Sequence, residues 1–545
     1  MSDQPPDSPD SPDSPDSPDS PDSPSDPDRP GVPDGPDVPD GPARHDDGSG
    51  ERRRDAAGRQ RPERKHGNLE RSVTRPAERS RTTDPARLAA YTVLRAVAGG
   101  AYANLELPKE LRDKGIRGRD AAFATELTYG ATRLRGLYDP IIAAAAGRPV
   151  AAIDENVLDT LRLGAHQLLG MRVAAHAAVD QTVGLARLVN GASAGGFVNA
   201  VMRRISEKDL DTWIAQVVPT DDPIAALATR HSHPEWVVRA LRAALVGHGA
   251  STAETIDADL EALLVSDNAA AKVSLVARPG LCEVEELTRA GATPSHLSRV
   301  GAILDSGDPG SISAVRSGRA AVQDEGSQLV ALAVATAAVN TGATHEMWLD
   351  LCAGPGGKAA LLATLGASRG ATLYANEISE HRTDLVRQTL DAAIDSGLEV
   401  MIGTSDGREI GEDEPETYDR VLVDAPCTGL GALRRRPEAR WRRTTGDLAE
   451  LGVLQRALLV SAIEATKPGG IIAYATCSPH LAETRFVVSD VVKKRHDVEI
   501  TDARDLFLDA NGITVAHLGE GPFVQLWPHV HGTDAMFFAL LRKHA

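Results

Sequence analysis

The chain has 545 residues, enough for about two to four domains, and its 41% hydrophobic content is typical of a soluble globular protein. No segment reaches the roughly 18 uninterrupted apolar residues of a membrane span, and the acidic N-terminus excludes a secretory signal, so we expect a cytoplasmic protein with no membrane partner. The net charge of −18 excludes a uniformly basic nucleic-acid-binding surface, but it is compatible with local basic patches.

The first 82 residues have no pattern that could build a core. Residues 6–23 are six Pro-Asp-Ser repeats, and residues 1–50 contain 14 Asp and two Arg. Proline removes backbone donors and the aspartates repel one another, which predicts a disordered tail. Residues 51–82 contain 11 Lys or Arg and form either a solvated linker or an electrostatic arm for RNA.

Helical signals dominate from residue 83 to residue 206. Asp84 followed by Pro85 is a typical helix start, and apolar residues then recur at helical spacing. Strand patterns are almost absent, so we expect one all-α domain over 83–206. Residues 207–317 are mixed, with a helix expected after Pro234, and they predict a small connecting domain.

From residue 318 to residue 545, strand-like and helical patterns alternate. The expected strands are 346–351, 371–376, 398–402, 420–424 and 470–475. Helices are expected at 379–394 and 447–466, among others. The alternation predicts an α/β domain with a mostly parallel sheet covered on both faces. Ligands bind to such sheets at the carboxyl ends of the strands.

A glycine-rich loop, Asp350 to Lys358, follows the first of these strands, and its glycines allow the backbone to approach a ligand closely. It is not a phosphate-binding loop, because Cys352 stands at the first glycine position and Ala359 follows the lysine. Ala359 also excludes the dinucleotide motif, which needs a glycine there. Carboxylates at the ends of the next strands favour a nucleoside site over a simple tight turn; they are Glu377, Asp406 and Asp424.

Two of the four cysteines, Cys427 and Cys477, end neighbouring strands. Adjacent parallel strands are about 4.8 Å apart, so both thiols can reach one pocket. The sequence has no CxxC pair and no cysteine–histidine spacing typical of a metal site, so we expect no metal. Cys282 is expected to be a buried small apolar residue.

A cysteine pair of this kind suits methylation of cytosine at carbon 5. A thiolate that adds to carbon 6 makes carbon 5 nucleophilic enough to attack a methyl sulfonium, and the adduct must later break. This chemistry needs an activated cysteine, an acid near ring nitrogen 3, for which Asp424 is placed, and a second group that assists release. The sequence Asp-Ala-Pro-Cys also lacks the aromatic residue with which amino-group methylases hold a flipped amine.

A basic run follows Cys427. It contains Arg434, Arg435, Arg436, Arg440, Trp441 and Arg442. Arginines suit backbone phosphates and tryptophan suits base stacking, which predicts an RNA-binding segment. The alternative interpretation is a solvated charged loop.

These motifs together resemble the RNA cytosine-5 methyltransferase family, and within it the bacterial methyltransferases of small-subunit rRNA, the Sun/Fmu group. The resemblance covers about residues 318–545 and lies in 322–328, 350–358, 424–429, 476–479 and 534–538. Four helical segments resemble the NusB-like RNA-binding domain; they are 126–130, 161–168, 176–180 and 196–201.

The resemblance implies a Rossmann-like class I methyltransferase domain that uses S-adenosylmethionine to methylate carbon 5 of a cytosine, with 16S rRNA as the expected partner. It implies that Cys477 is the nucleophile and that Cys427 aids product release. The residues expected to bind the cofactor are Cys352, Ala353, Gly354, Pro355, Gly356, Gly357, Lys358, Glu377, Asp406 and Asp424. Two of them depart from the family pattern, because Gly354 stands where Ala is common and Glu377 where Asp is common. We expect a monomer.

Two other functions are compatible with part of the sequence. A DNA cytosine methylase would use the Pro-Cys cysteine, Cys427, as its nucleophile, but the paired Cys477 motif and the NusB-like region oppose this. A non-catalytic RNA-binding or antitermination factor could carry an inactive methylase domain, which the intact cysteine pair and loop oppose. Methyl transfer to RNA or to DNA would distinguish the three functions.

Overall fold

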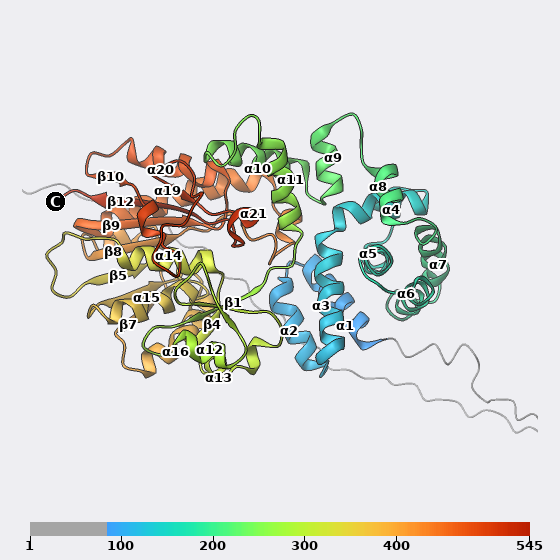
Figure 1. Ribbon diagram of the computed structural model, residues 1–545, viewed down its shortest axis with the longest axis horizontal. Helices are drawn as coiled ribbons and strands as arrows, with labels where there is room; N and C mark the ends of the chain where they lie inside the picture. The colour runs from blue at the N-terminus through green and yellow to red at the C-terminus, as the bar shows by residue number, and fades with distance from the viewer. Residues whose placement is uncertain (1–83) are drawn as a thin grey trace, which may run out of the picture. The chain divides into compact units, whose positions relative to one another are not determined.

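The computed structural model describes residues 84–545 (Figure 1). The expected disordered tail and basic linker therefore lie outside the described residues. The first helix, α1 (Pro85–Ala98), begins as predicted, because the Asp84 side chain accepts hydrogen bonds from the backbone N–H groups of Ala86 and Arg87. A side chain in this capping position satisfies N–H groups that have no partner within the helix.

The N-terminal region is helical throughout, as predicted, with no strand between residues 84 and 206. After α1 come α2 (Ala103–Asp113), α3 (Gly118–Arg133), α4 (Arg135–Ala146), α5 (Glu155–Leu169), α6 (Ala175–Val189) and α7 (Ala194–Ile205). Their apolar faces meet in a core that includes Tyr138 and Met202. A Cβ on Gly164 would lie 2.5 Å from the Met202 sulfur, so glycine allows α5 and α7 to pack closely.

The middle region combines helices with a small sheet. Its helices are α8 (Leu210–Val217), α9 (Pro223–Arg230), α10 (Glu235–Gly247), α11 (Ile256–Asp267), α12 (Val284–Arg289) and α13 (Ser313–Arg316). The sheet has the antiparallel order β2 (Thr293–Pro294), β3 (Gly301–Leu304), β1 (Val273–Ala277), β4 (Ala320–Val322). Pro234 precedes α10, as expected. Because β4 pairs with β1, the small sheet continues past residue 317; the exact domain boundaries stay predictions.

The C-terminal region is built on one large sheet. Its strand order is β10 (Val498–Thr501), β12 (Phe537–Lys543), β9 (Thr466–Thr476), β8 (Tyr418–Asp424), β5 (Met347–Asp350), β6 (Thr372–Asn376), β7 (Val400–Gly403), and β11 (Val524–Gln525) pairs with β12. The five strands from β9 to β7 are parallel, and β10, β11 and β12 are antiparallel to their neighbours. The five strands and the mostly parallel sheet are confirmed.

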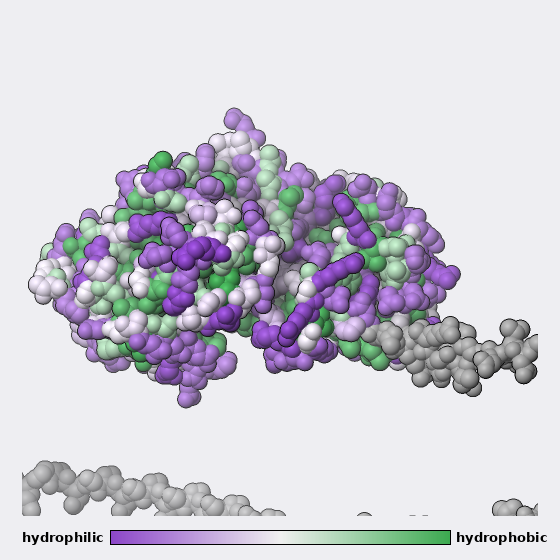
Figure 2. Space-filling model, turned by 60° about the horizontal axis from the view of Figure 1, so that its bottom comes forward, coloured by the Kyte–Doolittle hydropathy of each residue, from purple (hydrophilic) through white to green (hydrophobic). Residues whose placement is uncertain are grey.

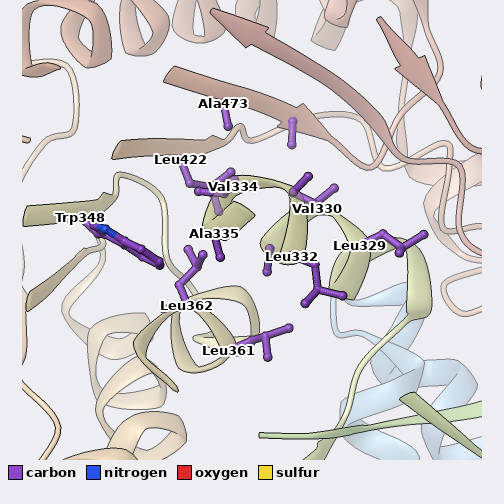
Figure 3. Packing of buried hydrophobic residues seen from close by; sticks show 14 of the residues in the cluster. Leu329, Val330, Leu332, Val334, Ala335, Trp348, Leu361, Leu362, Leu422 and Ala473 are labelled. Atoms are coloured by element: carbon purple, nitrogen blue, oxygen red, sulfur yellow. The ribbon is translucent and has the colours of Figure 1, made fainter. Parts of the chain in front are cut away.

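Helices cover both faces of this sheet (Figure 1). The helices of this region are α14 (Glu325–Thr336), α15 (Gly357–Ala367), α16 (Glu380–Asp395), α17 (Ile410–Asp413), α18 (Ala439–Arg442), α19 (Thr445–Ala465), α20 (Arg485–Val492) and α21 (Pro528–His531). Because side chains alternate along a strand, Leu422 packs with α14 and α15, while Val421 and Val423 pack with α19 and α20. Figure 3 shows Leu422 and Trp348 beside the leucines of α14 and α15.

No helix between residues 84 and 545 is long and apolar enough to cross a membrane. Hydrophilic and hydrophobic residues are mixed over the face shown in Figure 2. Exposed large apolar side chains such as Val453 and Ile513 occur elsewhere along the described chain, as is normal for a folded protein surface.

The arginine-rich segment 434–443 joins the C-terminal region to the helical and middle regions. Arg440 has no exposed surface. It donates to the carbonyl oxygens of Ser232 (3.0 Å) and Asp267 (3.1 Å) and to the side-chain oxygen of Asn268 (2.8 Å). A buried guanidinium needs such acceptors, because unpaired polar groups are costly inside a protein.

The next two residues of this segment contact the helical region. Trp441 donates to the Thr132 carbonyl (3.3 Å), and its ring fills the space where a Cβ on Gly136 would lie, 2.4 Å from a ring carbon. Arg442 donates to the Val97 carbonyl (2.7 Å). Trp441 and Arg442, which the sequence predicts to bind RNA, thus hold the segment against the helical region.

Most of the run therefore makes contacts within the protein, and its RNA-binding role stays a prediction. Arg434 is buried and donates to the Gly532 carbonyl, and Arg435 pairs with Asp324 at 2.8 Å. Together with Arg440, Trp441 and Arg442, they use their polar groups on the protein itself. Of the six residues, Arg436 alone is exposed.

Replacing Arg440 by alanine should destabilise the protein. The substitution leaves two buried carbonyl oxygens and one partly buried amide oxygen without a donor. Each buried acceptor without a partner costs about 1–3 kcal/mol, so we expect a loss of about 3 kcal/mol. The control is Arg443→Ala, because Arg443 is a partly exposed residue whose pair with Asp447 spans 3.5 Å and is worth about 0–1 kcal/mol. Thermal unfolding followed by circular dichroism should show a lower midpoint for Arg440→Ala than for Arg443→Ala. Equal midpoints would contradict a stabilising role of the Arg440 hydrogen bonds.

Candidate functional site

The candidate site lies where the parallel strands end. Strands β5, β6, β7, β8 and β9 run in the same direction, so their carboxyl ends share one edge of the sheet. The loops that follow four of them carry the predicted cofactor residues, and the loops after β8 and β9 also carry the two cysteines. The topology therefore brings together residues that are up to 127 positions apart, from Asp350 to Cys477.

The loop between β5 and α15 makes a tight turn. Gly356 precedes the helix with φ +107°, a conformation that favours glycine. A Cβ there would lie 2.8 Å from the Thr389 side chain, and Thr389 itself donates to the Pro355 carbonyl (2.9 Å). Thr389 lies on α16, so this helix holds the loop in place. The loop backbone, including Ala353, and the N-terminus of α15 at Gly357 lie at the sheet edge.

Glu377, directly after β6, is buried and reaches back to this loop. Its carboxylate accepts from the Gly354 N–H (3.1 Å) and the Ser379 N–H (3.2 Å), and it pairs with Arg382 at 3.3 Å. A Cβ on Gly354 would lie 2.2 Å from Glu377 Oε2. The two departures from the family pattern are therefore in direct contact, and the longer glutamate occupies the space that an alanine would need.

Two further polar side chains lie at this edge. Asp406 follows β7, where Arg408 binds its carboxylate at 3.0 Å and lowers its pKa. Asn376, which the sequence analysis missed, donates to the carbonyls of Leu351 (3.2 Å) and Ser405 (3.1 Å) and so joins the loops after β5 and β7. An asparagine at the end of a buried strand is the signal that could have identified it.

Asp350, the last residue of β5, is fully buried, and neither carboxylate oxygen has a hydrogen-bond partner within residues 84–545. Burial raises its pKa to about 7, and the nearby Asp424 charge adds to the effect. A buried carboxyl group without a hydrogen-bond partner reduces the stability of the protein. Asp350 is therefore a candidate hydrogen-bonding group for a ligand beside the loop. Cys352, two residues on, packs into the core, and burial raises the pKa of its thiol.

The two cysteine sulfurs lie 3.4 Å apart and are partly exposed, so the strand ends do bring the thiols together. The hydrogen bond from Cys427 lowers the pKa of Cys477; burial and Asp424 oppose this, while Lys358 and Arg436 support it. The same hydrogen bond and burial raise the pKa of Cys427 well above its usual value. These directions favour ionisation at Cys477, with Cys427 as the thiol that donates to it.

Lys358 links the cofactor loop to the cysteine pair. Its ammonium lies 2.7 Å from the Asp424 carboxylate, and only 12% of its side chain is exposed. Burial lowers the pKa of Lys358, but the charge and hydrogen bond of Asp424, together with Cys477 and Asp350, outweigh burial, and the pKa is raised. Lys358 thus stays charged close to Cys477.

Glu483 is a second residue that the sequence analysis missed. It is fully buried and accepts hydrogen bonds from the backbone N–H (2.7 Å) and hydroxyl (2.5 Å) of Thr428 and from the Ser478 hydroxyl (2.6 Å). Thr428 follows Cys427 and Ser478 follows Cys477. The glutamate lies six positions after Cys477, and no pattern of spacing identified it.

Cys282 is buried, as expected, and burial raises its pKa to about 11. Within residues 84–545 no group of three or more His, Cys, Asp or Glu side chains is arranged to hold a metal ion.

Comparison with known proteins connects this geometry with a family. Residues 338–542 match the family model described as 16S rRNA methyltransferase RsmB/F, and residues 84–207 match the NusB family. A Mycobacterium tuberculosis protein named as a methyltransferase is 53% identical over 469 residues, which cover 85% of this chain and 98% of that protein.

The ribosomal RNA small subunit methyltransferase B of Pseudomonas putida is 30% identical over 467 residues, covering 84% of this chain and 98% of that protein. The crystal structure of the protein PH0851 has a TM-score of 0.67 at 21% identity and covers 87% of this chain and all of that one. At this identity the structural match shows a shared fold.

The contact between Gly354 and Glu377 makes a testable prediction. Gly354→Ala should displace the carboxylate, break its hydrogen bond to the loop, and weaken binding of S-adenosylmethionine by roughly tenfold or more, since a hydrogen bond to a charged group is worth about 1.5–3 kcal/mol. Adding Glu377→Asp shortens the side chain by one methylene and should restore most of the affinity. Calorimetry on both single variants and the double variant measures this coupling. A double variant that binds no better than Gly354→Ala would contradict it.

Proposed function

Because the chain belongs to the 16S rRNA methyltransferase RsmB/F family, we propose that it methylates carbon 5 of a cytosine in small-subunit rRNA through a covalent cysteine adduct. The observation that carries the proposal is the pair of sulfurs 3.4 Å apart, with Cys477 as the readily ionised member, beside the Lys358–Asp424 pair. Such an arrangement suits nucleophilic addition to a pyrimidine ring.

The residues at the sheet edge fit the cofactor. Methyltransferases of this family take the methyl group from S-adenosylmethionine, which supplies it on a sulfonium. Gly354 and Gly356 leave space for close approach, and the buried carboxylates Glu377 and Asp350 offer acceptors for hydroxyl or ammonium groups. In this proposal Glu377 contacts the ribose, the Asp406 carboxylate lies nearby, and Lys358 remains paired with Asp424.

The first chemical step belongs to Cys477. Its thiolate adds to carbon 6 of the cytosine and forms a carbon–sulfur bond, while a proton passes to ring nitrogen 3 from the Asp424–Lys358 pair. The electron pair displaced from the ring double bond makes carbon 5 the nucleophile that takes the methyl group. Lys358 and Arg436 stabilise the thiolate before attack and so increase the fraction of Cys477 in the reactive form.

The release step belongs to Cys427. The carbon 5 proton passes to water, the ring double bond re-forms, the carbon–sulfur bond breaks, and the proton on nitrogen 3 returns to the Asp424–Lys358 pair. Cys427 donates a hydrogen bond to the departing Cys477 sulfur, as the 3.4 Å contact allows. Without this donor the leaving thiolate is less stable, so the adduct lasts longer.

The alternative of a DNA cytosine methylase would make Cys427 the nucleophile. The raised pKa of Cys427 opposes this role, and the NusB match at residues 84–207 favours an RNA partner. A non-catalytic factor is disfavoured because both thiols and the cofactor loop are in place. Acting on ribosomal RNA, the protein is proposed to work in the cytoplasm.

Alanine substitutions of the two cysteines should have different effects on the reaction. Cys477→Ala removes the nucleophile, so neither adduct nor methylated RNA should form. Cys427→Ala allows attack but slows release, so a covalent protein–RNA complex should accumulate. A denaturing gel of each variant with RNA and cofactor should show an RNase-sensitive shifted band for Cys427→Ala alone. The band with Cys477→Ala instead would exchange the roles, and full activity of both variants would overturn covalent catalysis.

Among the six predicted RNA-binding residues, Arg436 is the exposed one, so its side chain is available for phosphate contact. Arg436→Ala should reduce the slope of log affinity for RNA against log salt by about 0.7–0.9, the value for one lost phosphate contact. The matched control is Arg369→Ala, an arginine whose side chain is 43% exposed and which lies three residues before β6, at the opposite edge of the sheet. Filter-binding titrations at several salt concentrations measure both slopes. A slope unchanged by Arg436→Ala would contradict a phosphate contact by Arg436.

A further inference from the structure

Glu483 ties the two cysteine-bearing loops to one carboxylate. It has no exposed surface, and one oxygen accepts from the Thr428 N–H while the other accepts from the hydroxyls of Thr428 and Ser478. The buried Gln455 amide also donates to it at 3.3 Å. Since Thr428 and Ser478 each follow a cysteine directly, a shift of this carboxylate would move both thiols.

The backbone of Glu483 is held as firmly as its side chain. The Tyr474 hydroxyl, on β9 and itself fully buried, donates to the Glu483 carbonyl at 2.8 Å. Residue 483 lies in a short 3-10 turn, Leu481–Glu483, packed against α10 and α19. The carboxylate therefore has a fixed position from which it acts on both loops.

Charges of opposite sign surround the two sulfurs. Cys477 and the Glu483 carboxylate raise the pKa of Cys427, and a hydrogen bond from the Gly429 backbone opposes them. The groups that act on Cys477 are Cys427, Asp424, Lys358 and Arg436. The Glu483 carboxylate disfavours a thiolate at Cys427. At Cys477 the Cys427 hydrogen bond, Lys358 and Arg436 favour a thiolate and together outweigh burial and the Asp424 charge.

We propose that Glu483 is a positioning residue that holds the two sulfurs in contact and confines the negative charge of the pair to Cys477. Its significance for catalysis rests on the proposed covalent mechanism, but the charge distribution is a property of the resting protein. Glu483 touches neither sulfur, and it acts through Thr428, through Ser478 and through its charge.

The test uses the full-length protein without RNA or cofactor. Limiting iodoacetamide reacts with thiolates, so the sulfur that carries the charge is alkylated, and mass spectrometry of the digested protein gives the share of label on each cysteine. The unaltered protein should be labelled mainly at Cys477. Glu483→Gln removes the anion with little change of shape, and the ratio of Cys427 to Cys477 label should rise at least threefold.

Two further variants separate charge from stability. Glu483→Asp keeps the charge, so the label should stay on Cys477, while the shorter side chain should slow methyl transfer to RNA at saturating substrate. Glu346→Gln removes a largely buried carboxylate that pairs with Arg420 (2.6 Å) before β5, at the opposite edge of the sheet from the cysteines. It should leave the labelling ratio unchanged, even if it costs as much stability.

An unchanged labelling ratio in Glu483→Gln would overturn the inference. An equal rise in Glu346→Gln would also overturn it, because the effect would then follow from general destabilisation. The proposed function fails separately: if the unaltered protein transfers no methyl group to RNA, covalent methylation is wrong, and the labelling ratios still decide the role of Glu483. Restoration of Cys477 labelling by Glu483→Asp after its loss in Glu483→Gln would support the inference.

Discussion

The parallel pairing of β8 with β9 is the constraint on which the candidate site depends. Asp424 pairs in register with Ala475, and the Ala425 N–H donates to the Ala475 carbonyl. Cys427 and Cys477 follow these positions by three and two residues, so the pairing brings the sulfurs to 3.4 Å. A slip of this pairing by one residue would turn the side chains to the other face of the sheet and separate the thiols.

At the same edge of the sheet, one buried cation links the proposed cofactor loop with the proposed nucleophile. Lys358 belongs to the glycine-rich loop, yet its ammonium lies against Asp424 and favours the thiolate of Cys477. The cofactor loop and the cysteine pair are therefore parts of one electrostatic unit. Changes in the loop should alter the pKa values of the two thiols, because charges in a partly buried site are screened less than charges on the surface.

The arginine-rich segment shows that residue type alone leaves more than one role open. Arginine and tryptophan are common in RNA-binding surfaces, and the segment follows Cys427 closely. In the folded protein the same donors satisfy carbonyl groups of the helical and middle regions, as Arg440 does with Ser232 and Asp267. A guanidinium has five donors and serves a buried junction as well as a phosphate. The segment fixes the helical region to the C-terminal region that carries the candidate site.

The sequence by itself determined the strand and helix pattern of the C-terminal region, the all-α N-terminal region, and the positions of the loop and both cysteines. These features are local, because side-chain periodicity and strand-end motifs depend on residues close together in the chain. Only the tertiary structure decided that Arg440 is buried, that Glu483 joins the two cysteine loops, and that Glu377 occupies the space beside Gly354. Each depends on contacts between residues that are distant in the chain, such as Arg440 with Ser232, 208 positions apart. Local patterns do not encode such partners, because burial and hydrogen bonding are fixed only when the elements pack together.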